Sequence, residues 1–311
     1  MNYPTFFDSK KTLNLFGLNE NLNFLLNLYS IKNLPKVLIF TGNKGSGKST
    51  LINHFLFTVF DEKNYDKINF KLIINSSFLN QFQNNIFPNI IYIKGADFKS
   101  VKVEDIRDLK SKILQTSISS KDRFIIFDDI ELFNKNSLNA LLKVIEEPSK
   151  KNFFFLINNK SKPLLETIKS RAVEIKIILN ENERLKIINE LADLHKLEIL
   201  LDPKSSKLSP GNFIKFNFIC NEYNISPSDD FLENLSKILN LYKKNKDILF
   251  INLIFFIADY YLTDLKRKNL LKNDRFFEIK NHIFEHLNNF MLYNLNQKSL
   301  IDSLDQKLKN E

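Results

Sequence analysis

The stretch that decides the fold begins at Val37, ends at Ser49 and has the sequence VLIFTGNKGSGKS. Its first five residues, Val37–Thr41, are mostly β-branched, aliphatic or aromatic, which predicts a buried strand. The next eight fit the pattern G-x-x-x-x-G-K-[ST] in full, and residues 49–60 predict a helix directly after it. A strand, a glycine-rich turn and a helix in this order form the setting in which backbone N–H groups bind phosphate.

Glycine is rare in this chain, and its placement indicates a binding site. Of only 6 glycines, three lie in this one turn. Glycine permits positive φ and close approach of the backbone to a ligand. In such a P-loop the lysine, Lys48, reaches the β- and γ-phosphates of ATP, and Ser49 binds Mg²⁺. The predicted nucleotide-binding residues are Gly42, Asn43, Lys44, Gly45, Ser46, Gly47, Lys48 and Ser49. The alternative is a glycine-rich turn without a ligand.

A second half of the site is predicted after a later apolar strand, Arg123–Asp128. Asp128 is expected to hold Mg²⁺ through water, together with Ser49. Asp129 occupies the place where an active ATPase carries Glu to orient the attacking water. Aspartate is one methylene shorter, and a shift of about 1 Å in such a group can lower a rate roughly 10²-fold. Glu131 could substitute, but its spacing is wrong; the plain alternatives are a turn acid at 128 and a helix cap at 129.

The first half of the chain alternates strand and helix patterns, which predicts an α/β fold with a parallel sheet covered on both faces. Strands are expected at residues 37–41, 90–93, 123–128, 153–158 and 173–178, and helices at 49–60, 103–115, 134–146 and 163–169. Residues 62–89 are rich in Asn and are interpreted as an insertion.

The second half of the chain is predicted to be helical throughout. Asn180 and Glu183 form a capping box that opens a helix extending to about residue 196. Ser209–Gly211, with the Asn that follows, predicts a break before a helix at 213–222, and everything from Phe231 onward has a helical pattern. The expected domains are therefore a nucleotide-binding domain at 1–178, a small helical domain at 179–226 and an all-helical domain at 227–311.

The composition sets the broad class. A chain of 311 residues with 43% hydrophobic and 26% charged residues is a packed protein and not a disordered one. Its one cysteine, Cys220, excludes a disulfide scaffold and a cysteine zinc cluster, and suits a reducing cytosol. The net charge of +9 favours nucleic acid as a partner. A bias toward Lys, Asn, Ile and Phe is equally what an AT-rich genome produces, so both explanations of the charge stay open.

A cytoplasmic location is expected. Residues 1–11 are polar and lack the apolar core of a signal peptide. The longest apolar run, residues 248–262, is interrupted by Asn252 and Asp259 and predicts a buried helix, not a membrane span.

Five segments, in this order and at this spacing, resemble the clamp-loader subunits of bacterial DNA polymerase III, which are AAA+ proteins. They are residues 15–17, 100–109, 128–148, 155–159 and 167–171. Ser209–Gly211 is similar to the lid turn of the delta-prime branch of that family in particular.

The resemblance implies an AAA+ P-loop ATPase domain, a small helical lid and a helical collar. It implies a five-subunit ring with delta-like and gamma/tau-like subunits, which opens a sliding clamp and places it on primed DNA. It also implies ATP and Mg²⁺ as ligands, Asn159 as sensor 1, and Arg171 as an arginine finger that acts in trans on a neighbour. Such a finger raises the rate of ATP turnover by about 10³–10⁵-fold. The alternatives are a loop asparagine and a surface arginine at a helix end.

Three departures from the family pattern refine this expectation. Ala172 replaces a cysteine after Arg171. Residues 62–89 contain no cysteine, so no zinc is expected. Gly211 aligns with the sensor 2 arginine of motor subunits. With Asp129, this favours a chain that binds nucleotide but hydrolyses it slowly or not at all, as in the delta-prime branch. The alternative is an active gamma/tau-like motor or a related DNA-dependent ATPase, and a nucleotide kinase is a third hypothesis.

One further pattern lies outside this account. His282, Glu285 and His286 fit H-x-x-E-H, a metallopeptidase pattern on a helix. Zinc needs a third protein ligand, and few residues follow. Solvated or interface positions on a helix are the favoured interpretation.

Overall fold

The computed structural model describes residues 3–74, 76–95, 121–146, 151–227, 229–269, 273–293 and 295–309. The chain divides into two compact units. The N-terminal unit contains Asn2–Ile187 together with Ser209–Gly211, and the C-terminal unit contains Ile188–Leu208 and Asn212–Glu311. The predicted division of the helical half into a lid and a collar stays a prediction.

A five-stranded parallel sheet forms the centre of the N-terminal unit, in the order β4-β5-β6-β1-β7. Its strands are β1 (Val37–Thr41), β4 (Ile90–Lys94), β5 (Arg123–Asp128), β6 (Asn152–Asn158) and β7 (Val173–Lys176). Every residue of β1, β5 and β6 is buried, as expected for parallel strands covered on both faces. The strand order places the ends of β1 and β5 on either side of β6, at the same edge of the sheet.

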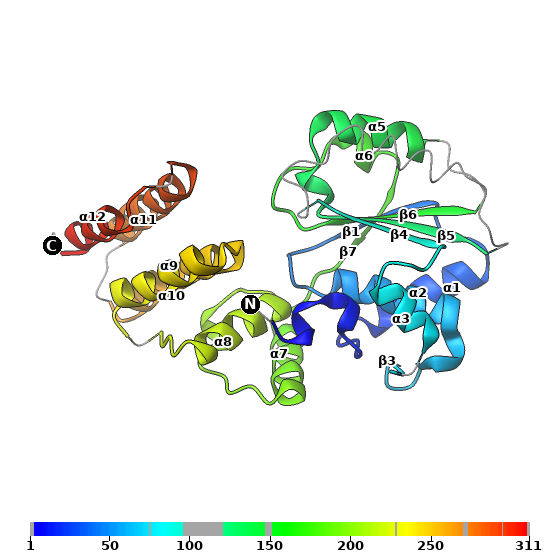
Figure 1. The fold of residues 1–311 in the computed structure, drawn as a ribbon, viewed down its shortest axis with the longest axis horizontal. Helices are drawn as coiled ribbons and strands as arrows, with labels where there is room; N and C mark the ends of the chain where they lie inside the picture. The colour runs from blue at the N-terminus through cyan, green and yellow to red at the C-terminus, as the bar shows by residue number, and fades with distance from the viewer. Residues whose placement is uncertain are drawn as a thin grey trace. The chain divides into compact units, whose positions relative to one another are not determined.

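Helices cover both faces of this sheet (Figure 1). On one face lie α1 (Asn19–Ser30), α2 (Lys48–Asp61) and α3 (Ser77–Gln83), and on the other lie α5 (Lys135–Ile145) and α6 (Glu166–Lys169). The predicted α/β fold class is therefore confirmed. The helix expected at 103–115 lies outside the described residues.

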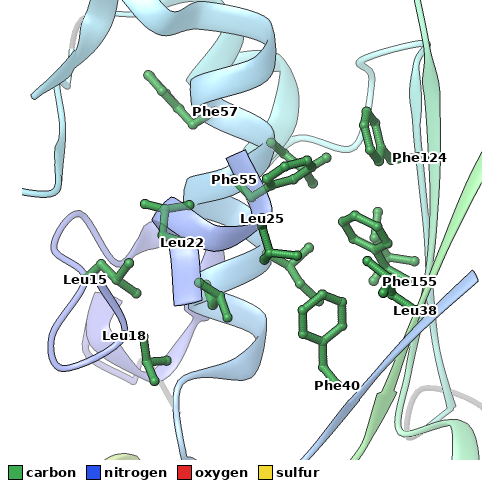
Figure 2. Close-up of a cluster of buried hydrophobic side chains, with 14 of the residues drawn as sticks. Leu15, Leu18, Leu22, Leu25, Leu38, Phe40, Phe55, Phe57, Phe124 and Phe155 are labelled. Atoms are coloured by element: carbon green, nitrogen blue, oxygen red, sulfur yellow. The ribbon is translucent and has the colours of Figure 1, made fainter. Parts of the chain in front are cut away.

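Aromatic side chains hold α2 against the sheet. Figure 2 shows Phe55 of α2 beside Phe124 and Phe155 of the sheet, and the ring centroids of Phe55 lie 5.6 Å from each. Phe40 of β1 meets Phe155 edge to face at 5.4 Å. Such pairs add about 0.5–1.5 kcal/mol each beyond the area that they bury. These contacts fix the position of α2, the helix that follows the P-loop, against the sheet.

Three local features go beyond the sequence expectation. The helix α1 was not predicted. Residues 62–89, interpreted as an insertion, form a short hairpin of β2 (Tyr65–Asp66) and β3 (Lys71–Leu72) followed by α3, whose Phe78 is buried in the core. The helix expected at 213–222 begins at Pro210, because proline suits the first helical position, where no N–H partner is needed.

The helical half contains the remaining long elements. They are α7 (Glu181–His195), α8 (Pro210–Glu222), α9 (Phe231–Asn245), α10 (Ile248–Arg267), α11 (Asn273–Tyr293) and α12 (Gln297–Lys309). The predicted capping box at the start of α7 is present. Asn180 N–H donates to Glu183 Oε2 at 2.8 Å, and Glu183 N–H donates to Asn180 Oδ1 at 2.9 Å.

Short 3₁₀ turns complete the described elements. They are η1 (Thr5–Phe7), η2 (Ser9–Lys11), η3 (Glu62–Asn64), η5 (Ile130–Leu132) and η6 (Pro203–Ser205).

Among the described helices, α10 is long and apolar enough to cross a bilayer, judged by length and composition alone. Seven of its side chains are buried, including Phe250, Ile254 and Leu262. It packs against α9 and α11 within the C-terminal unit. A core helix meets the same criterion, so the apolar length of α10 is weak support for a membrane span.

A buried histidine in α2 predicts loss of stability in acid. His54 Nδ1 lies 2.9 Å from the Tyr65 hydroxyl, and burial lowers the pKa of His54 to about 3. The unfolded chain binds a proton below about pH 6.5, whereas the folded chain does not. The free energy of unfolding should therefore fall by about 1.4 kcal/mol per pH unit below that point, or about 2 kcal/mol at pH 5.

Urea titrations at pH 7 and pH 5 check this. His54→Gln keeps a hydrogen-bonding side chain near Tyr65 but does not titrate, so it should lose clearly less stability between the two pH values. Equal losses in the wild type and the variant would contradict the assignment.

Candidate nucleotide site

The P-loop has the backbone geometry of a phosphate cradle. Gly45 and Gly47 have φ of 84° and 90°, a region that residues with a Cβ rarely adopt. Gly47 is the N-cap of α2, which begins at Lys48. The free N–H groups of the first helical turn therefore face the loop, where the helix dipole favours an anion.

The Lys48 ammonium lies inside the loop. Its Nζ donates to Gly42 O at 2.7 Å and to Asn43 O at 2.8 Å. Burial lowers the pKa of Lys48 to about 8, and the opposing carboxylates of Asp128 and Glu131 limit the shift. Nζ also donates to Ser46 Oγ at 3.4 Å, so all three of these partners are neutral oxygens. A buried ammonium with neutral partners is partly desolvated, and an anionic ligand stabilises it strongly.

Asp128, at the end of β5, lies beside the start of α2. Its Oδ2 accepts a hydrogen bond from the Tyr92 hydroxyl at 2.6 Å and lies 3.4 Å from Ser49 Oγ. Burial raises the pKa of Asp128. Serine hydroxyl and carboxylate oxygens are ligands that Mg²⁺ accepts, so this pair fits the ion. Tyr92 was not predicted, and only its place in the strand beside β5 hinted at it.

Asp129 and Asn159 meet, although 30 residues separate them in sequence. Asn159 Nδ2 donates to Asp129 Oδ1 at 2.7 Å, and Lys44 Nζ lies 3.6 Å from the same oxygen. Asp129 is buried and has a left-handed backbone with φ 54°. The Asp129 carboxylate thus accepts a hydrogen bond from the Asn159 amide and forms an ion pair with the Lys44 ammonium.

Glu131 does not take the place of Asp129. Its Oε1 accepts the N–H of Asn159 at 3.1 Å, the N–H of Ser161 at 3.3 Å and the hydroxyl of Ser161 at 2.8 Å. It therefore faces the loop after β6. The sequence pattern suggested Glu131 only as a substitute acid and gave no signal of this contact.

Arg171 follows the short helix α6. Its Nη2 pairs with Glu146 Oε1 at 2.9 Å, and the two side chains are 39% and 44% exposed. Nη1 also donates to Thr167 O at 2.9 Å. An exposed pair of this kind contributes about 0–1 kcal/mol, so the guanidinium is easily released to another partner.

The turn Ser209–Gly211, which we call the lid turn, belongs to the same compact unit as the P-loop. Gly211 N–H donates to Gly45 O at 2.9 Å, and the Ser209 hydroxyl donates to Lys44 O. A Cβ on Gly211 would lie 2.8 Å from Gly45 O. The lid turn therefore makes a close backbone contact with the P-loop.

This contact predicts that Gly211→Ala weakens ATP binding by about three- to tenfold. Alanine favours a helix by about 1 kcal/mol, but the clash is with backbone and forces the P-loop or the turn to move, at about 1–3 kcal/mol. Fluorescence titration with an ATP analogue measures the effect. Asn212→Ala is the matched control and should bind as the wild type does; an equal affinity for Gly211→Ala would contradict the prediction.

The two histidines of the H-x-x-E-H pattern lie side by side on α11, with ring centroids 3.9 Å apart and ring planes tilted by 33°. His286 Nδ1 lies 2.9 Å from His282 O. Within the part of the chain that the structure describes, no group of three His, Cys, Asp or Glu side chains is arranged to hold a metal ion.

Together, the fold and this site define the class: an α/β P-loop protein with a helical C-terminal half. A family model described as DNA polymerase III, delta subunit, matches residues 17–180, which is more than half of the chain. The chain therefore belongs to this family of clamp-loader subunits.

Similar curated proteins come from the same polymerase. DNA polymerase III subunit delta-prime of Buchnera aphidicola subsp. Schizaphis graminum is 28% identical over 198 residues, which cover 61% of this chain and 60% of that protein. Subunit gamma of the same organism is 22% identical over 243 residues, covering 76% and 64%. The matched segment spans less than two thirds of either relative.

Solved structures show a distant likeness. A DNA polymerase III gamma subunit-related protein of Thermotoga maritima is 15% identical, with a TM-score of 0.47, and the match covers 91% of this chain and 98% of that one. The RuvB Holliday junction branch migration motor of the same organism is 16% identical, with a TM-score of 0.45, covering 97% and 86%.

Proposed function

We propose that this chain is a delta-prime-like subunit of a DNA polymerase III clamp loader. In this role it joins delta-like and gamma/tau-like subunits in a five-subunit ring and helps to load the sliding clamp onto primed DNA in the cytoplasm. Membership of the family over residues 17–180 supports the assignment, because the P-loop, Asp128 and Arg171 all lie in that segment.

The proposal includes binding of ATP with Mg²⁺. The observation that carries it is the Lys48 ammonium held inside the P-loop, with Ser49 Oγ 3.4 Å from Asp128 Oδ2. Lys48 and the N–H groups at the start of α2 would hold the phosphates, and Ser49 and Asp128 would hold the ion. Bound Mg²⁺ supplies neutralisation of phosphate charge.

The proposal also includes slow hydrolysis or none. Asp129 is one methylene shorter than glutamate, and its Oδ1 is occupied by Asn159 and Lys44. Gly211 supplies no cation to the γ-phosphate, and its N–H is committed to Gly45 O. Both features favour a nucleotide that stays bound and stabilises the subunit. They disfavour a nucleotide that is hydrolysed.

Arg171 is proposed to act in trans. It is partly exposed, pairs with Glu146, and donates to Thr167 O and to Ser170 Oγ. Release from an exposed pair requires little free energy, about 0–1 kcal/mol. The planar guanidinium is suited to bidentate binding of a neighbour's γ-phosphate.

Reconstitution with the gamma-type and delta-type subunits of the same organism tests the assignment. Clamp loading onto primed DNA should depend on this chain, and the chain should co-elute with the assembled ring. Loading at the same rate when the chain is left out would contradict it.

A second candidate is an active motor subunit. One observation favours it: the P-loop motif is complete, and Ser49 Oγ lies 3.4 Å from Asp128 Oδ2, so the groups that would hold Mg²⁺ for hydrolysis are present. Turnover by the purified chain separates the two candidates.

A further inference from the structure

We propose that Glu131 is a positioning residue of the nucleotide site. Its carboxylate sets the conformation of the loop after β6 and thereby fixes the Asn159 amide against Asp129. The inference rests on the proposed nucleotide binding, and its consequence for the loop can be tested separately.

A single oxygen of Glu131 gathers the donors of this loop. Oε1 accepts from Asn159 N–H at 3.1 Å, from Ser161 N–H at 3.3 Å and from the Ser161 hydroxyl at 2.8 Å. The N–H between them, of Lys160, donates to Asn158 Oδ1 at 3.0 Å. Three consecutive backbone N–H groups are thus satisfied by side chains, two of them by Glu131.

The loop depends on these contacts for its shape. Lys160 has φ 60°, a left-handed conformation that is unfavourable for a lysine. Hydrogen bonds to a carboxylate are roughly twice as strong as those between neutral groups. Glu131 is itself only 5% exposed, so water competes little for its oxygen. A buried charge-assisted cluster therefore holds a strained loop in one conformation.

The held conformation decides where the Asn159 side chain lies. Its backbone N–H is bound to Glu131, and its Nδ2 reaches Asp129 Oδ1 at 2.7 Å. Glu131 and Asp129 both follow β5 and lie two residues apart in sequence. The loop after β6 is therefore held at two points, the Asn159 N–H and the Asn159 side chain. Without Glu131 the loop keeps the Asn159–Asp129 and Lys160–Asn158 contacts but loses the other three hydrogen bonds, so the Asn159 amide is held less firmly.

The carboxylate oxygens of Glu131 are not placed for a hydrolytic role. Its Oε1 is committed to the loop, and its Oε2 is buried without a hydrogen-bond partner among the described residues. This asymmetry makes two substitutions informative. Glutamine keeps an acceptor at Oε1 but places an amide where Oε2 lies, whereas alanine removes the acceptor, and both remove the same charge.

The experiment compares Glu131→Gln and Glu131→Ala in the full chain by three measurements. They are the Kd for a fluorescent ATP analogue with Mg²⁺, hydrogen exchange of the peptide that contains residues 159–161, and the melting temperature. Glu131→Ala should weaken binding by about tenfold and lose amide protection in the loop. Glu131→Gln should melt lower, since its buried amide lacks an acceptor, yet keep loop protection and a Kd within about twofold of the wild type.

A double variant of Glu131 and Asn159 measures whether the two residues affect ATP affinity independently. If Glu131 acts through Asn159, Glu131→Ala adds no further loss of affinity to Asn159→Ala. Multiplying losses would overturn the inference, as would equal losses of affinity for the Gln and Ala variants. If the wild type binds no nucleotide, the proposed function fails, while hydrogen exchange still decides whether Glu131 holds the loop.

Discussion

Lys48→Ala should weaken ATP binding by about two orders of magnitude while the protein stays folded. A hydrogen bond from a charged group contributes about 1.5–3 kcal/mol, and a factor of 10² corresponds to about 2.7 kcal/mol. Folding should survive because burial lowers the pKa of Lys48 to about 8, so the charged lysine is disfavoured in the folded state before ligand binds. Isothermal titration calorimetry measures the loss.

An exposed lysine provides the control for Lys48. Lys67 lies in the same unit, is 58% exposed at its side chain and pairs with Glu62. Lys67→Ala should bind ATP as the wild type does. If Lys48→Ala retained affinity within about threefold, the P-loop would not be the nucleotide site.

Arg171→Ala should lower the ATPase rate of the reconstituted ring by about 10³-fold at the affected site, the lower end of the range for arginine fingers. The chain's own affinity for ATP should stay unchanged, because Arg171 contacts Glu146 and Thr167 in its own chain. A phosphate-release assay on the assembled complex gives the rate, and the isolated variant gives the affinity.

Two variants make this result specific. Lys169→Ala removes an exposed cation from α6 that pairs with Glu166, and should leave the ring's ATPase intact. Arg171→Lys keeps the charge but loses the planar fork, and should recover only a small part of the rate. An unchanged rate for Arg171→Ala would exclude the finger.

Local patterns in the sequence were sufficient to predict the strands of the sheet. The bounds of β1 and β5 agree with prediction, since each contains four consecutive apolar residues; β1 is followed directly by Gly42, and β5 ends at Asp128. The helix α1 escaped prediction because it is rich in asparagine and Leu18, its N-cap, makes no side-chain cap. Its place depends on Leu22 and Leu25, which are fully buried in the core of the N-terminal unit.

The site was predictable only where adjacent strands bring motifs together. Asp129 and Asn159 follow β5 and β6, which are neighbours in the sheet, so their contact could be anticipated. The contacts of Tyr92 with Asp128 and of Glu131 with Ser161 depend on side-chain direction across 36 and 30 residues. No spacing rule encodes such directions, and only packing determines them.

Binding and turnover of ATP, measured together on the isolated wild-type chain, decide whether this chain binds nucleotide without rapid hydrolysis. A fluorescent ATP analogue gives the affinity, and a phosphate-release assay on the same sample, with primed DNA and clamp added, gives the rate. A delta-prime-like subunit should show saturable, Mg²⁺-dependent binding that Lys48→Ala weakens about 10²-fold, with turnover that is slow or at background. Robust hydrolysis that Lys48→Ala abolishes would contradict this prediction and identify the chain as a motor subunit.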